Sequence, residues 1–154
     1  MRPAFVFAVV AAALIAAGPA DATIVPQRGI ARAELRMTKA DVRARLGTPV
    51  RVQSGKNQFG RYANFVYARV TVMFQGGSRV TGLRTNSRLE RTSAGVGVGS
   101  SEAQVKAGVA GIKCRTEFGS RHCFVGKFLP GHVITDFQIK KGRVSSVVVG
   151  IVLD

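Results

Sequence analysis

The chain has 154 residues, of which 46% are hydrophobic, so it is long enough for one domain or two very small ones and too apolar for a disordered chain. Lysine and arginine outnumber aspartate and glutamate by 23 to 8, a formal net charge of +15 at pH 7. This charge favours polyanions such as teichoic acid, lipopolysaccharide, anionic phospholipid or extracellular nucleic acid. The basic residues are scattered, so a generic solvated surface is the alternative, and we expect no specific nucleic-acid site.

The first 22 residues have the pattern of a secretory signal peptide. Arg2 gives a positive start, an apolar run follows from Ala4 to Ala17, and Ala20-Asp21-Ala22 has small residues where a signal peptidase reads them. The apolar run is shorter than the about 20 residues that a membrane-spanning helix needs. We therefore expect a secreted or periplasmic protein with no transmembrane segment after cleavage. Because no cysteine lies near the cleavage point, we do not expect a lipoprotein.

The first predicted element of the mature chain is a short helix after Thr38. The Thr38 hydroxyl can cap it by accepting from an orphan backbone N–H group, and Asp41 suits the positive end of the helix dipole. Gly47 can close the helix in the left-handed conformation, and Pro49 prevents its continuation. A helix of this length needs packing to be stable.

Four strand-like segments follow this helix. Val70, Val72 and Phe74 alternate with Thr71 and Met73, the period of two that is typical of a half-buried strand. A loop rich in Gly, Asn and Gln separates the first two segments, and Gly76-Gly77 predicts a tight hairpin turn. The predicted strands are residues 50–53, 63–68, 70–74 and 79–85.

The same order of elements recurs about 63 residues later. Thr38 falls on Ser101 and Val70 on Val133, and Ser101 with Gln104 can form a capping box before a second helix. Further strands are predicted at residues 113–116, 121–126, 132–140 and 143–153, with a turn at 140–142. The segment from Asn86 to Gly95 is the expected connector.

These patterns together predict an α+β fold. Each of two tandem units would be a short helical segment packed on an antiparallel β-meander. The expected boundaries are a signal peptide at residues 1–22, a first unit at 23–88 and a second unit at 89–154. Units of about sixty residues are marginal alone, so we expect the two to pack together.

The two cysteines, Cys114 and Cys123, are expected to form a disulfide, because an even pair outside the cytoplasm is most simply joined. The alternative is a metal site that adds His122 and His132. This spacing lacks the tight ligand pair of most zinc sites, and adjacent strand residues such as His122 and Cys123 point to opposite faces. We expect no bound metal or cofactor.

Catalytic patterns are scarce in the mature chain. His122 and His132 could act as bases, but neither lies near an identifiable nucleophile in the sequence. No serine lies in a nucleophile-elbow pattern, and no pair of carboxylates has a telling spacing. We therefore expect no enzymatic activity, with a small hydrolase that uses one of these histidines as the remote alternative.

One strand carries a candidate contact stripe. Phe65, Tyr67 and Arg69 share one side of their strand, and aromatic residues with arginine are typical of protein interfaces. Phe65 is better explained as core, whereas Tyr67 is left open between core and surface. Arg84, on a neighbouring strand, can extend the basic strip, so Tyr67, Arg69 and Arg84 are the predicted binding residues.

Several motifs resemble those of a known fold. The helix that ends in LGTP, the FVY and VTVMF strands and the GGSRVTGL hairpin resemble the BamE/SmpA-type fold of small envelope proteins. The fold is similar to the β-lactamase inhibitor protein architecture, which joins two such units, each with its own disulfide. The resemblance extends from Gly29 to Thr85 and more faintly from Gly95 to Val149. BamE-type proteins are typically lipoproteins, but this chain has no lipidation cysteine. The inhibitor family has a disulfide in each unit, but this chain has cysteines only in its second half.

The expected function is binding. The resemblance and the charge imply a non-enzymatic protein of the cell envelope whose partner is a protein or an anionic envelope polymer. An inhibitor of an extracellular enzyme, similar to the β-lactamase inhibitor protein, is the main alternative.

Overall fold

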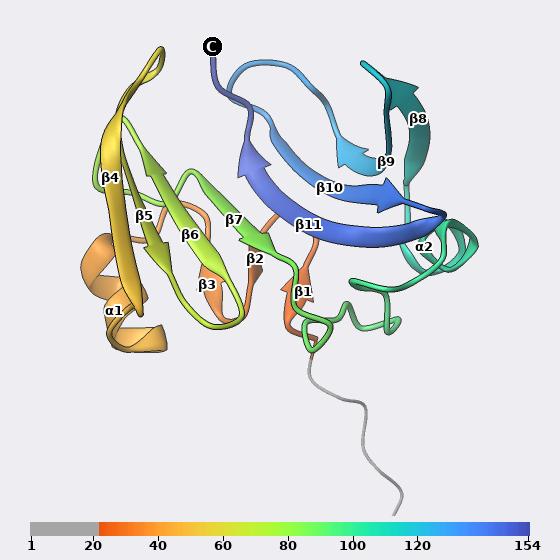
Figure 1. Ribbon diagram of the computed structural model, residues 1–154, viewed down its shortest axis with the longest axis horizontal. Coiled ribbons are helices and arrows are strands. Elements are labelled where there is room, and N and C mark those ends of the chain that lie inside the picture. Colours follow the sequence, from red (N-terminus) through yellow and green to blue (C-terminus); the bar gives the residue numbers. More distant parts are fainter. Residues whose placement is uncertain (1–21) are drawn as a thin grey trace, which may run out of the picture.

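One sheet of eight antiparallel strands dominates the computed structural model, which describes residues 22–154 (Figure 1). The strands are β4 (Arg51–Asn57), β5 (Gly60–Val66), β6 (Thr71–Gln75), β7 (Gly82–Thr85), β8 (Lys113–Glu117), β9 (Ser120–Gly126), β10 (Val133–Lys140) and β11 (Arg143–Ile151). Their order in the sheet is β4-β5-β6-β7-β11-β10-β9-β8. Each strand predicted after residue 50 is therefore present. The predicted signal peptide lies outside the described residues, apart from Ala22.

Two short helices and a small sheet lie on one side of the large sheet (Figure 1). The helices are α1 (Lys39–Leu46) and α2 (Glu102–Gly108), and the small sheet consists of β1 (Ile24–Val25), β2 (Gly29–Ile30) and β3 (Ala33–Glu34). Among residues 22–154, no helix is long and apolar enough to cross a membrane.

Both helices begin with the predicted caps. The Thr38 hydroxyl accepts from the Asp41 N–H at 3.1 Å, while the Asp41 carboxylate accepts from the Thr38 N–H at 3.0 Å. Ser101 and Gln104 repeat this reciprocal pair at α2, at 3.2 and 2.8 Å. Each capping box satisfies two backbone donors, which fixes where the helix begins. Gly47 ends α1 with φ +80° and ψ −160°, so the predicted left-handed closing conformation is wrong.

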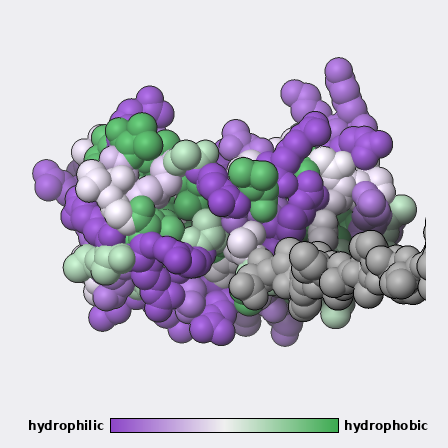
Figure 2. Space-filling view, turned by 90° about the horizontal axis from the view of Figure 1, so that it is seen from below, coloured by the Kyte–Doolittle hydropathy of each residue, from purple (hydrophilic) through white to green (hydrophobic). Residues whose placement is uncertain are grey.

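The core lies between the large sheet and the layer of helices and small strands. The Phe65 and Phe74 rings, 4.8 Å apart, are buried on this side, where Val42 of α1 is also buried. In the other half of the sheet the buried residues include Phe137 and Val147. Seen from the helix side, the outer surface is mainly hydrophilic with small apolar groups between (Figure 2).

The predicted α+β class is wrong. Within the described residues the helices hold only 8 and 7 residues, and eleven strands make the molecule mainly β. The two predicted meanders also share one sheet, because β7 pairs with β11 from Thr85↔Val147 to Gly82↔Gly150. Separate meanders would each leave an edge strand with unpaired backbone groups, and joining the edges satisfies these groups.

Three further elements differ from the sequence prediction. No strand is predicted in residues 23–34, where β1, β2 and β3 lie, because two-residue strands show no periodicity. Residues 54–57 are predicted as loop but extend β4, since β5 satisfies their backbone despite Gly55. The connection after β6 spans residues 76–81 and is longer than the predicted tight turn at Gly76-Gly77.

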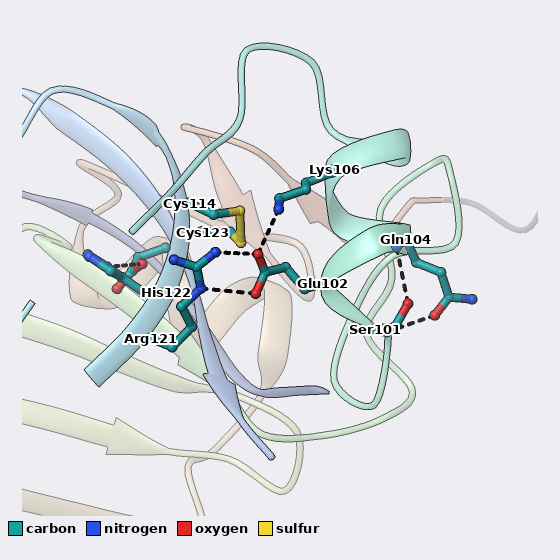
Figure 3. The surroundings of a disulfide bond; sticks show 9 residues. Ser101, Glu102, Gln104, Lys106, Cys114, Arg121, His122 and Cys123 are labelled. Carbon is teal, nitrogen blue, oxygen red and sulfur yellow. Dashed lines mark hydrogen bonds and ion pairs between the residues drawn. A yellow bond between two sulfur atoms is a disulfide. The ribbon is translucent and has the colours of Figure 1, made fainter. Parts of the chain in front are cut away.

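The predicted disulfide is confirmed. Cys114 of β8 and Cys123 of β9 are directly opposite each other and joined (Figure 3). A Glu102 oxygen and the two sulfurs lie within 4.8 Å of one another, but joined sulfurs are not thiolate ligands for a metal ion. His122 points to the other side of the strand, as expected from the alternation of strand side chains.

Glu102 ties α2 to the disulfide hairpin (Figure 3). Its carboxylate accepts from Arg121 Nε of β9 at 3.0 Å and lies 2.8 Å from Lys106 Nζ on its own helix. The hydrogen bonds from Arg121 and then from Lys106 lower the pKa of Glu102 to about 2. The ion pair between Glu102 and Arg121 therefore stabilises the packing of α2 on the second half of the sheet.

We predict that the double substitution Cys114→Ser/Cys123→Ser lowers the free energy of unfolding by about 2–3 kcal/mol, because the bond closes a short loop in the unfolded chain. Urea denaturation of both proteins measures the difference. Equal midpoints would contradict this contribution.

We also predict a pH-dependent loss of stability in Glu102→Gln. The folded pKa of about 2 lies below the reference value of 4.5, so the stabilisation by Glu102 is fully present above pH 4.5 and declines as the pH falls toward 2. Thermal unfolding should show Glu102→Gln less stable than wild type at pH 7, with the gap closing toward pH 2. Glu117→Gln is the matched control, because its pair with Arg115 is more exposed. A gap that is constant with pH would contradict the assignment.

Candidate protein-binding face

The large sheet has one face that carries neither the helices nor the small sheet (Figure 1). We call it the open face. Strand register places one row of its residues across six strands: Gln53, Asn64, Met73, Gly82, Gly150 and Ile134. The next row contains Arg51, Val66, Thr71, Arg84, Val148, Asp136, Phe124 and Lys113. The face therefore runs from amide and apolar residues to charged and aromatic ones.

A cleft of about 540 Å³ lies near the middle of the open face, where the two halves of the sheet meet. Gly82 and Gly150 are paired at this junction and both line the cleft. A Cβ atom on Gly82 would lie 2.8 Å from Met73 Cε, closer than such atoms pack. Glycine therefore leaves room for Met73 and lowers the floor of the cleft. Ile134 and Val148 line its other side.

The β4–β5 end of the cleft has a fixed polar wall. Asn57 and Gln75 exchange two side-chain hydrogen bonds, at 3.0 and 3.1 Å, and Gln75 Nε2 also donates to the Arg61 carbonyl at 3.2 Å. Tyr62 lies over Gly55, whose added Cβ would come 2.8 Å from the Tyr62 hydroxyl. These contacts hold the amides and the ring in place before a partner binds, which reduces the entropy lost on binding.

The opposite end of the open face holds a buried histidine between two carboxylates. His122 Nδ1 lies 2.9 Å from Asp136 Oδ1. Its Nε2 atom lies 3.3 Å from Glu117 Oε2, but without the geometry of a hydrogen bond. Burial raises the pKa of the Asp136 carboxyl, and the neighbouring His122 opposes this shift. Gln138 Nε2 donates to the second Asp136 oxygen, so the carboxylate is satisfied on both sides.

Beside this histidine, an arginine lies against two aromatic rings. The Arg115 guanidinium is 4.6 Å from the Phe124 ring centroid and 5.3 Å from that of Phe128. It is also paired with Glu117 at 2.9 Å. Arginine stacked on aromatic rings is a frequent feature of the residues that contribute most to protein interfaces.

Two hairpin turns project at opposite ends of the sheet, on the side away from the helices (Figure 1). The β4–β5 turn carries Phe59 and the β8–β9 turn carries Phe118, both of them exposed, Phe118 completely. Burial of an exposed phenylalanine side chain by a partner removes apolar area from water and so contributes to binding. The open face is thus flanked by two aromatic side chains suited to contact a partner.

The surface as a whole carries excess positive charge. Residues 22–154 contain seven carboxylate side chains and 22 lysines and arginines. Four of the seven form ion pairs with lysine or arginine within the protein, Asp136 is hydrogen-bonded to His122, and Asp41 caps α1. Since the carboxylates are occupied internally, the remaining cations give the surface a positive potential that attracts an acidic partner.

The structure places the predicted binding residues in two separate locations. Arg84 is exposed on the open face, between Thr71 and Val148. Tyr67 and Arg69 line a different cleft beside α1. The Tyr67 hydroxyl donates to the Gly47 carbonyl at 3.1 Å, and burial raises its pKa. Tyr67 is thus partly core and partly cleft wall.

The open-face cleft was not predicted from the sequence. Tyr62, Asn64 and Met73 occur in predicted or adjoining strand segments, but nothing local shows that they meet Ile134 from the other half. The only sequence signal is glycine inside two strands, which indicates a close approach or an opening in a sheet. His122 is a hydrogen-bonded strand histidine, and His132 lies in the exposed connection before β10.

No family model matches the chain, and no curated protein matches it by sequence. Two solved structures are similar in fold. One is an extracellular protein containing an SCP domain from Bacillus anthracis strain Ames, with a TM-score of 0.50 and 10% identity over 76% of this chain. The chain spans only 44% of that protein. The other is a DUF4309 family protein, YjgB, from Bacillus subtilis strain 168, with a TM-score of 0.49 and 16% identity over 74% of this chain and 78% of its own.

These comparisons give no support to the resemblance to BamE-type proteins or to the β-lactamase inhibitor protein. At such low identity, the likeness to the SCP-domain protein concerns the fold alone.

Proposed function

We propose that this protein is an extracytoplasmic, non-enzymatic binding protein that holds an acidic protein partner on the open face of its sheet. The observation that carries this proposal is the uncovered sheet face, with a preformed central cleft and an exposed phenylalanine turn at each end. The positive charge supplies attraction at a distance, and the aromatic and apolar residues supply the contact energy.

The size of the open face favours a macromolecular partner over a small ligand. The cleft occupies only its centre, whereas the phenylalanine turns and the Arg115–Phe124–Phe128 stack lie toward its ends. A small molecule in the cleft would leave Phe59, Phe118 and Phe128 exposed. A folded partner that fits the face can cover them all, and standard interfaces bury about 800 Å² on each side.

Two observations support the extracytoplasmic location. The Cys114–Cys123 disulfide persists in oxidising compartments, and the apolar leader has the length of a signal peptide. The similar fold from Bacillus anthracis belongs to a protein described as extracellular, which agrees with this location.

An inhibitor of an extracellular enzyme is the second candidate. It is favoured by the two phenylalanine turns, since exposed side chains that project beyond a sheet can enter the active-site cleft of an enzyme. This function would use the same open face. Assays against a panel of β-lactamases test the particular inhibitor class that the sequence motifs resemble, and no inhibition at micromolar protein would exclude that class.

We predict that substitutions on the open face weaken partner binding. The mature chain would be immobilised, partners captured from envelope and extracellular fractions, and the purified partner measured by surface plasmon resonance. Arg84→Glu should lower the association rate, and Phe118→Ser should weaken affinity by about tenfold or more through faster dissociation.

Matched controls lie on the connector between the two halves. Arg88→Glu makes the same charge change, and Leu89→Ser removes a similarly exposed apolar side chain. Both should bind like wild type. If the connector variants weaken binding as much as the open-face variants, the open face is not the interface. Retention that is unchanged at high salt would remove the electrostatic part of the proposal.

A further inference from the structure

A second cleft, of about 580 Å³, lies beside α1 and away from the open face. We call it the arginine cleft, because Arg32, Arg45 and Arg69 line it together with Tyr67, Val70 and Glu90. These residues come from the β2–β3 turn, the end of α1, the β5–β6 connection and the segment after β7. Its volume lies in the range of small-molecule sites.

Glu90 fixes the position of Arg69. The Glu90 side chain is buried, and its Oε1 atom lies 2.6 Å from Arg69 Nε. Neither carboxylate oxygen has a hydrogen bond of good geometry among the described residues, so the charge of Arg69 is the main compensation for this buried carboxylate. Because the contact engages Nε, the terminal nitrogens of the half-exposed Arg69 are left for another acceptor.

Arg32 and Arg45 hold each other through backbone carbonyls. Arg32 Nη2 donates to the Arg45 carbonyl at 2.7 Å, and Arg45 Nη1 donates to the Arg32 carbonyl at 3.2 Å. Arg45 Nη1 also lies 3.2 Å from Glu34 Oε1. Each guanidinium has five N–H groups, so both keep unused donors.

We propose that the arginine cleft binds a small ligand through a tetrahedral anionic group with three terminal oxygens, a phosphate or sulfate monoester. Three arginines from three separate elements line one cleft. Donors from three side chains match three terminal oxygens better than the two coplanar oxygens of a carboxylate. The volume exceeds that of the anion alone, and Tyr67 and Val70 provide a wall for the organic part of the ligand. The hydrogen bond from Tyr67 to Gly47 holds that ring in place.

This site is independent of the proposed partner on the open face. Arg84 and Phe118 do not line the arginine cleft, so loss of one activity leaves the other testable. The two sites also differ in character, because one is a broad face and the other a confined basic cleft.

The test is titration of the mature protein with inorganic phosphate at constant ionic strength, followed by ¹⁵N NMR. We expect saturable shifts of the amide signals of Arg32, Leu46 and Arg69. Arg32→Ala and Arg45→Ala should each weaken phosphate binding about tenfold, as expected for loss of a charged hydrogen-bonding partner. Arg88→Ala on the connector, which removes the same charge, should leave the affinity unchanged.

Arg69 requires a separate design, because its removal leaves Glu90 buried and unpaired. Arg69→Lys keeps the charge but loses the forked donor geometry, and should still weaken binding. Arg69→Met combined with Glu90→Gln removes both charges and should abolish the response while the protein stays folded. No amide shift in millimolar phosphate, or equal weakening in Arg88→Ala, would overturn the site.

Three probes distinguish the source of the anion. Glycerol 3-phosphate tests a soluble ester, and phosphatidylcholine vesicles with and without phosphatidic acid test a lipid headgroup. Tighter binding of either ester than of inorganic phosphate, lost in Arg45→Ala, supports the cleft and assigns the source. Vesicle binding that Arg88→Ala reduces as much as Arg45→Ala would show general charge attraction and overturn the cleft as the binding site.

Discussion

The pairing of β7 with β11 is the interaction on which the rest of the structure depends. Four residue pairs, from Thr85↔Val147 to Gly82↔Gly150, join two four-stranded halves into one sheet. Without this ladder each half would expose an edge strand and the apolar residues beside it, such as Leu83 and Val149. The ladder also aligns the helix sides of both halves, so that one core forms beneath the whole sheet.

The same ladder creates the open-face cleft. The Gly82↔Gly150 pair lies at the end of the ladder, and the residues that line the cleft come from both halves of the chain. A Cβ atom at Gly82 would displace the end of the Met73 side chain, which lines the cleft, so a change at the junction alters the cleft. The same strand pairing therefore completes both the sheet and its central cleft.

Most of the few carboxylates in this basic protein make structural contacts with other side chains. Glu102 joins α2 to β9, Glu90 compensates Arg69, and Asp136 faces His122. The cations left over are therefore exposed without acidic neighbours, and this gives the protein its attraction for anions. The open face and the arginine cleft use that excess in different ways, because in the cleft Glu90 fixes Arg69 and backbone carbonyls fix Arg32 and Arg45.

The sequence by itself determined the local structure: Thr38 and Ser101 start the helices, alternation places Val72 and Phe74 in the core, and Cys114 with Cys123 forms the disulfide. These features depend on neighbours within a few residues or on the compartment. Only the tertiary structure decided the fold class and the sites. The pairing of Gly82 with Gly150 joins distant segments, and so does the cleft that Arg32 and Arg69 both line. No local pattern encodes which strand edges meet or which turns share a cleft.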